Sequence, residues 1–356
     1  MRFNVMYDNG EKILTGIHPS EGNYCPNNLH LPEGITQIGE GAFANRPEIQ
    51  YVFIPNSVKN INYAAFHDCT GLLGITIPDS VEGIDEEAFW GCTRLEKINW
   101  GKNLKFIGRC AFTKCKSLKG AMIMPQNLVT IGARVFSGTG VTAVTLGTKV
   151  ENISPAAFRG RSGESKIKEI VISPKNPNYY VNNNWIVTKK TKILIGAAGD
   201  KANKIPTDIK GIGIDACAGL PIKKVEFNKV KIIGGGAFEN CDQLITIRIS
   251  KNVEEIRGEA FADCKNLEAI EIEEKSKLKE IGMSAFKGCR KLIPPKFDEK
   301  KVKIGPYAFA LCGEEKHRDI LGEIIARWMA LTDEEKESII LERFKEKESI
   351  ILERFK

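Results

Sequence analysis

An alanine–phenylalanine pair that returns at almost constant spacing constrains this chain more than any other feature. The pairs are Ala42-Phe43, Ala65-Phe66, Ala88-Phe89, Ala111-Phe112, Ala157-Phe158, Ala237-Phe238, Ala260-Phe261, Ala285-Phe286 and Ala308-Phe309. Val135-Phe136 and Ala216-Cys217 hold the same place in two less regular units. Five of the ten successive steps are 23 residues, four lie between 21 and 25, and the step from Phe158 to Cys217 is 59. About eleven copies of one unit therefore predict a fold that grows by stacking and not around one central core.

One unit, from Val81 to Ile98, shows how the repeat folds. Its regularly placed residues are Val81, Ile84, Ala88, Phe89, Cys92, Leu95 and Ile98. The last part, Leu-x-x-Ile-x-Ile in most copies, alternates with period two as β-strands do, and a Pro or Gly ends it. One unit cannot bury these side chains alone. Units are therefore expected to stack at strand spacing, about 4.8 Å, with a parallel β-sheet on one face and apolar columns inside.

The fuller pattern, Ile-Gly-x-x-Ala-Phe-x-x-Cys-x-x-Leu-x-x-Ile-x-Ile-Pro, is nearly complete from Ile38-Gly39 and from Ile281-Gly282. With it, residues 31–313 resemble the BspA-type leucine-rich-repeat family. The resemblance implies a right-handed leucine-rich-repeat solenoid that acts as a non-enzymatic protein-binding scaffold. Family members are mostly bacterial and protist proteins, often surface-exposed, and are implicated in adhesion or host-protein binding. A cell-surface or secreted location is implied on the same ground.

Two further segments flank or interrupt the repeat. Residues 1–30 contain the turn Asp8-Asn9-Gly10-Glu11 between apolar runs, and they predict a β-hairpin that caps the first unit. About residues 174–205, a turn cluster and apolar runs around Asn182-Asn183-Asn184 predict a β-hairpin that projects from the solenoid. This hairpin is either a spacer or an aromatic contact site formed by Tyr179, Tyr180 and Trp185.

Residues 314–356 leave the repeat pattern and predict a C-terminal α-helical cap. Apolar residues with helical spacing are Ile320, Leu321, Ile324, Ile325, Trp328 and Met329. A capping box at Thr332-Asp333-Glu334-Glu335 predicts a second helix, in which Glu335–Lys345 recurs as Glu346–Lys356. The helices either cover the last unit or meet a partner. The second alternative would make the protein an assembly module that self-associates through residues 333–356, and a recent duplication also accounts for the repeated segment.

Charge and hydropathy limit the function classes. The net charge is +7 without a Lys/Arg run, so nucleic-acid binding is not predicted. No stretch of about 18 apolar residues predicts a transmembrane helix. The first ten residues have no apolar h-region, so a signal peptide is not predicted and a cytoplasmic location stays open beside the surface one.

Seven of the ten cysteines sit three residues after a repeat Phe: Cys69, Cys92, Cys115, Cys241, Cys264, Cys289 and Cys312. Their period places them in one column inside the stack. A column offers no unique disulfide pairing, and no Cys-x-x-Cys zinc motif occurs, so we predict that these are buried free thiols. Gly211-Ile212-Gly213 resembles part of a dinucleotide loop, but it is the Ile-Gly step of a degenerate unit. No catalytic motif appears. We therefore predict no enzyme activity, no metal and no cofactor.

A strip of outward-facing side chains is the predicted binding surface. In each strand the residue between the two inward Ile positions faces outward, and so does the residue two places earlier. The predicted partner-binding residues are Tyr51, Phe53, Thr76, Lys97, Asn99, Met122, Thr145, Val171, Lys224, Glu226, Arg248 and Glu271. We expect the apolar part of a protein partner to lie over Tyr51, Phe53 and Met122. The alternative is a strip that is simply solvated.

Overall fold

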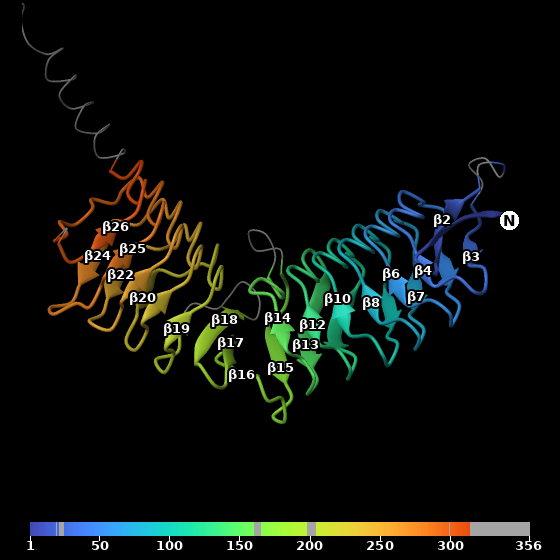
Figure 1. Cartoon of the computed structure of the whole chain (residues 1–356), viewed down its shortest axis with the longest axis horizontal. Helices are drawn as coiled ribbons and strands as arrows, with labels where there is room; N and C mark the ends of the chain where they lie inside the picture. Colours follow the sequence, from blue (N-terminus) through green and yellow to red (C-terminus); the bar gives the residue numbers. More distant parts are fainter. Residues whose placement is uncertain (19, 21–24, 160–164, 198–203, 299, 314–356) are drawn as a thin grey trace, which may run out of the picture.

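The chain forms a curved stack of about twelve turns, arched along its length (Figure 1). This computed structural model describes residues 1–18, 20, 25–159, 165–197, 204–298 and 300–313. Over these ranges the regular structure is β-strand, and no helix long and apolar enough to cross a membrane is found. The predicted C-terminal helices and the predicted self-association segment, residues 333–356, lie outside the described residues.

The predicted parallel strands form one ladder along the stack, broken into three sheets (Figure 1). The first sheet contains β3 (Asn28–His30), β5 (Tyr51–Phe53), β7 (Gly74–Thr76) and β9 (Lys97–Asn99). The second contains β11 (Lys119–Ile123), β13 (Gly140–Leu146) and β15 (Glu169–Ile172), and the third β20 (Lys224–Glu226), β22 (Thr246–Ile249) and β24 (Ala269–Ile272). We call this ladder the long-strand face. It confirms the parallel sheet that the Leu-x-x-Ile-x-Ile pattern predicts.

A second parallel ladder, built from two-residue strands, runs along another side of the stack and was not predicted. Its first part contains β4 (Gln37–Ile38), β6 (Asn60–Ile61), β8 (Gly83–Ile84), β10 (Phe106–Ile107), β12 (Thr130–Ile131) and β14 (Asn152–Ile153). Its second part contains β19 (Gly211–Ile212), β21 (Ile232–Ile233), β23 (Glu255–Ile256), β25 (Glu280–Ile281) and β26 (Lys303–Ile304). The prediction of a parallel sheet on one face was therefore incomplete. The second ladder was missed because each of its strands has two residues, which are too few to show the alternation typical of a strand.

Phenylalanine side chains form the predicted internal column. Phe66 and Phe89 are fully buried, and their rings stack with centroids 5.3 Å apart and planes 6° apart. The same stacking joins Phe238 to Phe261 at 5.1 Å in the second half. Ring-to-ring stacking thus runs from Phe43 to Phe136 and again from Phe238 to Phe309. The apolar core extends along the stack instead of closing around one centre.

The thiols form a second column beside the rings, as the spacing predicts. Cys69 and Cys92 are fully buried, and each Sγ–H donates to the carbonyl oxygen of the Phe in the preceding turn. The sulfur–oxygen distances are 3.0 Å to Phe43 and 3.2 Å to Phe66. Burial raises the pKa of both thiols well above 9.0, so they are neutral hydrogen-bond donors at physiological pH.

An antiparallel hairpin, β1 (Phe3–Asp8) and β2 (Glu11–Ile17), precedes the first turn. β2 also pairs in parallel with β4 and so starts the short-strand ladder. Ile38 and Phe43 in that first turn are 0% and 1% exposed. The hairpin thus covers the apolar residues that a bare first turn would leave open.

The insertion is part of the stack and does not project from it, which corrects the predicted arrangement. β16 (Tyr179–Asn182), β17 (Trp185–Thr188) and β18 (Ile193–Ala197) pair antiparallel, and β18 then pairs in parallel with β19. β18 supplies a rung of the short-strand ladder, which is why there are about twelve turns and not eleven. Ile186 packs in the apolar cluster of the first half and Trp185 in that of the second half.

Candidate partner-binding face

Three parallel strands of the long-strand face enclose a groove of about 770 Å³. Register places Tyr51 of β5, Gly74 of β7 and Lys97 of β9 in one row. Gly74 has no side chain, so the row is open in its middle, and a Cβ built there would lie 3.7 Å from the nearest heavy atom. The side chains of Tyr51 and Lys97 stand on either side, two strand spacings apart, or about 10 Å. We call this space the Gly74 groove.

The next row supplies a second aromatic ring and a polar pair. Phe53 is 51% exposed and Tyr51 44% exposed. The Phe53 ring stacks on His30 of β3 with centroids 4.2 Å apart and planes 4° apart. Beside it, Asn99 Nδ2 donates to Thr76 Oγ1 at 3.1 Å. These contacts hold the wall side chains in place before any partner arrives, which lowers the entropy that binding must overcome.

Charge differs between the two halves of the strip. Lys97 is exposed and forms no ion pair with any described residue. In the second half, Lys224 lies 3.4 Å from Glu226, and Arg248 lies 3.3 Å from Glu273. The cations of the second half are therefore partly neutralised by neighbours on the protein, whereas Lys97 is open to a carboxylate from outside.

The remaining strip positions extend the face without adding to the groove. Thr145 on β13 is half-buried, and Val171 on β15 is 43% exposed. Glu226 and Glu271 are exposed on β20 and β24. The structure thus brings five of the predicted residues together at the groove: Tyr51, Phe53, Thr76, Lys97 and Asn99. The others are spread along the stack.

Met122 does not face outward, and its assignment to the binding strip was wrong. Met122 comes four positions after Leu118, whereas Ile98 comes three positions after Leu95, and the pairing of β11 with β13 shifts register between Gly120 and Ala121. This bulge turns Met122 inward, where it is 9% exposed, and Ile123 outward, where it is 67% exposed. The sequence does contain this information at Pro125, which ends the strand. Counting back from Pro125 places Met122 inward, as observed, whereas counting forward from Leu118 places it outward.

The aromatic contact site predicted on the insertion is also not formed. Trp185 is fully buried, and its Nε1–H donates to the carbonyl oxygen of Lys204 at 2.8 Å. Tyr179 is 8% exposed. Tyr180 is half-buried, with Lys192 Nζ 4.4 Å from its ring centroid. The insertion has no 23-residue period, so the sequence could not indicate which of its aromatic residues face inward.

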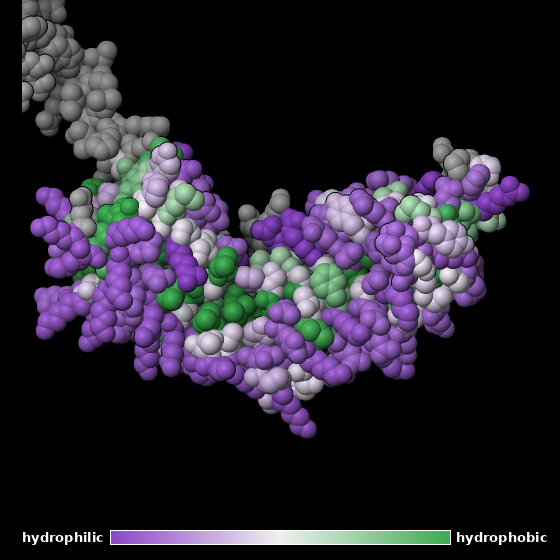
Figure 2. All heavy atoms as spheres, in the orientation of Figure 1, coloured by the Kyte–Doolittle hydropathy of each residue, from purple (hydrophilic) through white to green (hydrophobic). Residues whose placement is uncertain are grey.

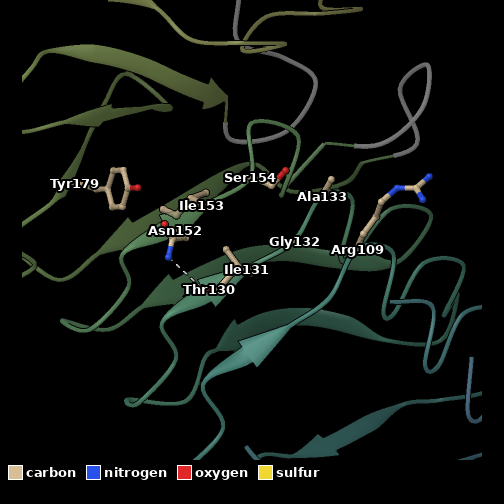
Figure 3. Close-up of a pocket in the computed structure, with 9 residues that line it drawn as sticks. All are labelled: Arg109, Thr130, Ile131, Gly132, Ala133, Asn152, Ile153, Ser154 and Tyr179. Carbon is tan, nitrogen blue, oxygen red and sulfur yellow. Dashed lines mark hydrogen bonds between the residues drawn. The ribbon is translucent and has the colours of Figure 1, made fainter. Parts of the chain in front are cut away.

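Tyr179 instead closes the end of the first short-strand part (Figure 3). Its hydroxyl donates to the carbonyl oxygen of Glu151 at 2.7 Å, and its oxygen faces the backbone N–H of Ile153 of β14 as an acceptor. Burial raises the pKa of Tyr179, so this hydroxyl keeps its proton. The ring forms one wall of a depression of about 420 Å³ over β12 and β14. Figure 2 shows apolar surface gathered around this middle part of the arch.

A row of rings outside the strip was missed by the sequence reasoning. His67 and Trp90 follow the repeat Phe in successive turns, and their rings stack with centroids 4.5 Å apart. Lys114 Nζ lies 4.3 Å from the Trp90 ring centroid. The place after Phe carries a different residue in most units, and no period marks it.

Among the described residues, no three His, Cys, Asp or Glu side chains are grouped as a metal ion would require.

Comparison with known proteins agrees with this architecture. The BspA type leucine rich repeat region matches residues 36–164 and 201–316, in six copies. A leucine rich cell surface protein from Faecalibacterium prausnitzii is 22% identical, with a TM-score of 0.53 over 88% of this chain and 85% of that one. A leucine-rich repeat protein from Eubacterium ventriosum is 19% identical, with a TM-score of 0.54 over 86% of this chain and 91% of that one.

The pneumococcal vaccine antigen PcpA is also similar, at 18% identity and a TM-score of 0.54, over 86% of this chain and 80% of that one. No curated protein shows significant sequence similarity to the chain. At these identities the solved structures establish a shared fold alone.

A leucine-rich-repeat solenoid is defined by stacked turns with a parallel ladder, buried columns and an outward strip that varies from turn to turn. This chain has all three features, with Phe and Cys in its columns. Because the repeat match covers more than half of the chain, the protein belongs to the BspA-type leucine-rich-repeat family.

Proposed function

We propose that the protein is a non-enzymatic scaffold that binds a partner protein through the Gly74 groove of its long-strand face, in adhesion or host recognition. Leucine-rich-repeat proteins of this family are generally non-catalytic binding proteins, which supports the general assignment. The similar Faecalibacterium protein is described as a cell surface protein, which supports a role at the cell surface.

The groove itself is the observation on which the proposal rests. It joins two half-exposed rings, an open floor at Gly74 and the Lys97 ammonium, which has no ion pair within the described part of the chain, on three strands. Rigid aromatic side chains around a concave space are typical centres of binding energy at protein interfaces. An apolar side chain of the partner would contact Tyr51 and Phe53, and a nearby carboxylate would pair with Lys97.

The test uses peptides selected from a random displayed library against the full chain, with affinities measured by calorimetry. Gly74→Leu fills the floor of the groove without a clash, since the nearest heavy atom to a Cβ, the carbonyl oxygen of Lys97, is 3.7 Å away. Ala269→Leu on β24 is the matched control, because it adds the same side chain at the equivalent strand position of the second half.

We expect Gly74→Leu, and separately Tyr51→Ser with Phe53→Ser, to weaken most selected peptides at least tenfold. Ala269→Leu should change their affinity less than twofold. Lys97→Glu should weaken the acidic peptides in particular and lower their salt dependence. If the selected peptides bind the Gly74→Leu and Tyr51→Ser/Phe53→Ser proteins as tightly as the unaltered chain, the groove is not the binding site.

A further inference from the structure

The last turn of the solenoid exposes residues whose equivalents in the preceding turn are buried. Ile304 of β26 is 39% exposed, whereas Ile281 at the same position of the preceding turn is fully buried. Phe309 and Cys312 are partly exposed, whereas the equivalent Phe286 and Cys289 are fully buried. These positions lie on the apolar and thiol columns. The columns therefore end at a surface that the described part of the chain does not cover.

Two further large side chains border this surface. Tyr307 is 73% exposed and Leu311 is 49% exposed, and both lie in the turn that carries Phe309. β26 is also the last strand of its ladder, so one edge of it has no neighbouring strand among the described residues. We call Ile304, Tyr307, Phe309, Leu311 and Cys312 the end face. An apolar end with an open strand edge is the feature that terminal caps cover in solenoids.

The opposite end of the stack shows what such a cover does. There the hairpin β1–β2 pairs with β4, and Ile38 and Phe43 of the first turn are 0% and 1% exposed. Ile38 occupies the same repeat position as Ile304, and Phe43 the same position as Phe309. The difference in exposure, 0% against 39% for the two Ile residues, measures what a cover at the end face would bury.

We propose that residues 320–329 of the same chain pack across the end face and bury it. The chain continues from Gly313 beside this surface, and only residues 314–319 separate it from Ile320. Six residues and their flanking bonds span up to about 20 Å, enough to return across one turn. The apolar positions Ile320, Leu321, Ile324, Ile325, Trp328 and Met329 fall on one side at helical spacing, and they would lie against Ile304, Tyr307 and Leu311.

An occupant from the same chain is favoured over a second copy by its local concentration. A short tether holds the segment at an effective concentration on the order of millimolar at the end face, which a separate molecule does not reach at ordinary protein concentrations. Its apolar residues match the end face in kind, and they include one Trp and one Met that can fill an irregular apolar surface.

Cys312 provides a reporter for this cover. It is the one cysteine that the described turns leave partly exposed, while the other nine are buried. The experiment alkylates the reduced full chain with N-ethylmaleimide and follows each cysteine by peptide mass spectrometry. Ile324→Asp combined with Trp328→Asp removes the apolar side of the segment. Glu323→Gln is the matched control, since it changes the polar position directly before Ile324.

We expect Cys312 of the unaltered chain to react slowly, and its alkylation rate to rise at least tenfold in the double variant. The other nine cysteines should keep their rates, which also shows that the solenoid stays folded, and Glu323→Gln should react as the unaltered chain does. Hydrogen exchange of the unaltered chain needs no substitution and should show protected amides within residues 320–329.

Three results would overturn the proposal. Equal, fast alkylation of Cys312 in the unaltered chain and the double variant would show that the end face is uncovered. Complete exchange of the amides of residues 320–329 within seconds would show that the segment does not pack. Protection of Cys312 that disappears on dilution, with a dimer mass by light scattering, would assign the cover to a second copy of the chain.

Discussion

The Sγ–H of Cys92 donates to the carbonyl oxygen of Phe66 across 26 residues of sequence, at 3.2 Å. Both residues are fully buried, and Phe66 is also the ring against which Phe89 stacks. The thiol therefore ties two consecutive turns together at the point where their aromatic rings meet. The same bond recurs from Cys115 to Phe89 and from Cys264 to Phe238. It accounts for a small, largely apolar side chain with a weak donor in this column, where Ala would leave the Phe carbonyl without the bond.

The Cys92 contact gives a first prediction about stability. Cys92→Ala removes the buried sulfur and its hydrogen bond, and we expect it to lower the free energy of unfolding by about 2 kcal/mol. Urea denaturation followed by Trp fluorescence measures this loss. Arg94→Ala, at an exposed position two residues later, should stay within about 0.5 kcal/mol of the unaltered chain. Equal stability of Cys92→Ala and Arg94→Ala would show that the thiol column does not hold the turns together.

The thiols also predict how stability depends on pH. Burial raises the pKa of Cys69 and Cys92 well above 9.0, whereas in the unfolded chain both ionise near that value. Above about pH 9 the unfolded state then binds fewer protons than the folded state, so stability falls as pH rises. The stabilising effect is complete below the pKa of the unfolded thiols. Each buried thiol should contribute a loss of about 1.4 kcal/mol per pH unit above it.

The measurement is the urea midpoint at pH 8 and at pH 10 in the presence of a reductant. The fall between the two should be smaller in Cys92→Ala than in the unaltered chain, because one ionising thiol is gone. An identical fall in the two proteins would attribute the alkaline loss to Lys and Tyr groups instead.

The recurring positions of the fold could be predicted because each inward side chain must meet its copy in the next turn. Phe66 and Cys92 follow from that rule, and so do the outward positions of Tyr51 and Phe53. The rule fails where the repeat slips by one residue, as at Met122, because a single extra residue in a strand exchanges its two faces. It gives no information on Trp185, since the insertion has no second copy to meet.

Local backbone geometry could not be predicted either. In most turns the residue before the repeat Ala has a positive φ, for example 51° at Ala64, 58° at Glu87 and 57° at Arg134. Gly or Asn would have signalled this conformation, but those residue types rarely stand there. The stacking of neighbouring turns imposes the left-handed conformation on residues that do not favour it alone.

Close contact between turns gives a third prediction, at Gly132. A Cβ on Gly132 would lie 2.5 Å from the backbone nitrogen of Arg109 and 2.6 Å from the carbonyl carbon of Gly108. Gly132→Ala must therefore push two turns apart, and we expect it to lower the free energy of unfolding by about 2–3 kcal/mol. Gly74→Ala is the matched control, since its Cβ would meet nothing closer than 3.7 Å. Thermal unfolding of the two variants should separate them clearly, and similar midpoints would contradict the packing described for the short-strand ladder.

The last prediction concerns the edge of β14, where the first part of the short-strand ladder ends. In the preceding turns, the carbonyl oxygen equivalent to that of Glu151 accepts a hydrogen bond from a backbone N–H of the following turn. The Val129 N–H donates to the Lys105 carbonyl oxygen, and the Glu151 N–H donates to the Val129 carbonyl oxygen. At Glu151 the Tyr179 hydroxyl takes that role at 2.7 Å.

Tyr179→Phe keeps the ring but leaves the Glu151 carbonyl without its donor, and we expect a loss of about 1–2 kcal/mol in the free energy of unfolding. Tyr180→Phe is the control, because its hydroxyl bond to Asp208 is exposed and should contribute less than about 0.5 kcal/mol. Hydrogen exchange should place the effect at Ile153, whose amide would exchange faster in Tyr179→Phe. A stability loss without faster exchange at Ile153 would mean that Tyr179 acts through packing of its ring and not as the hydrogen-bonding end of the ladder.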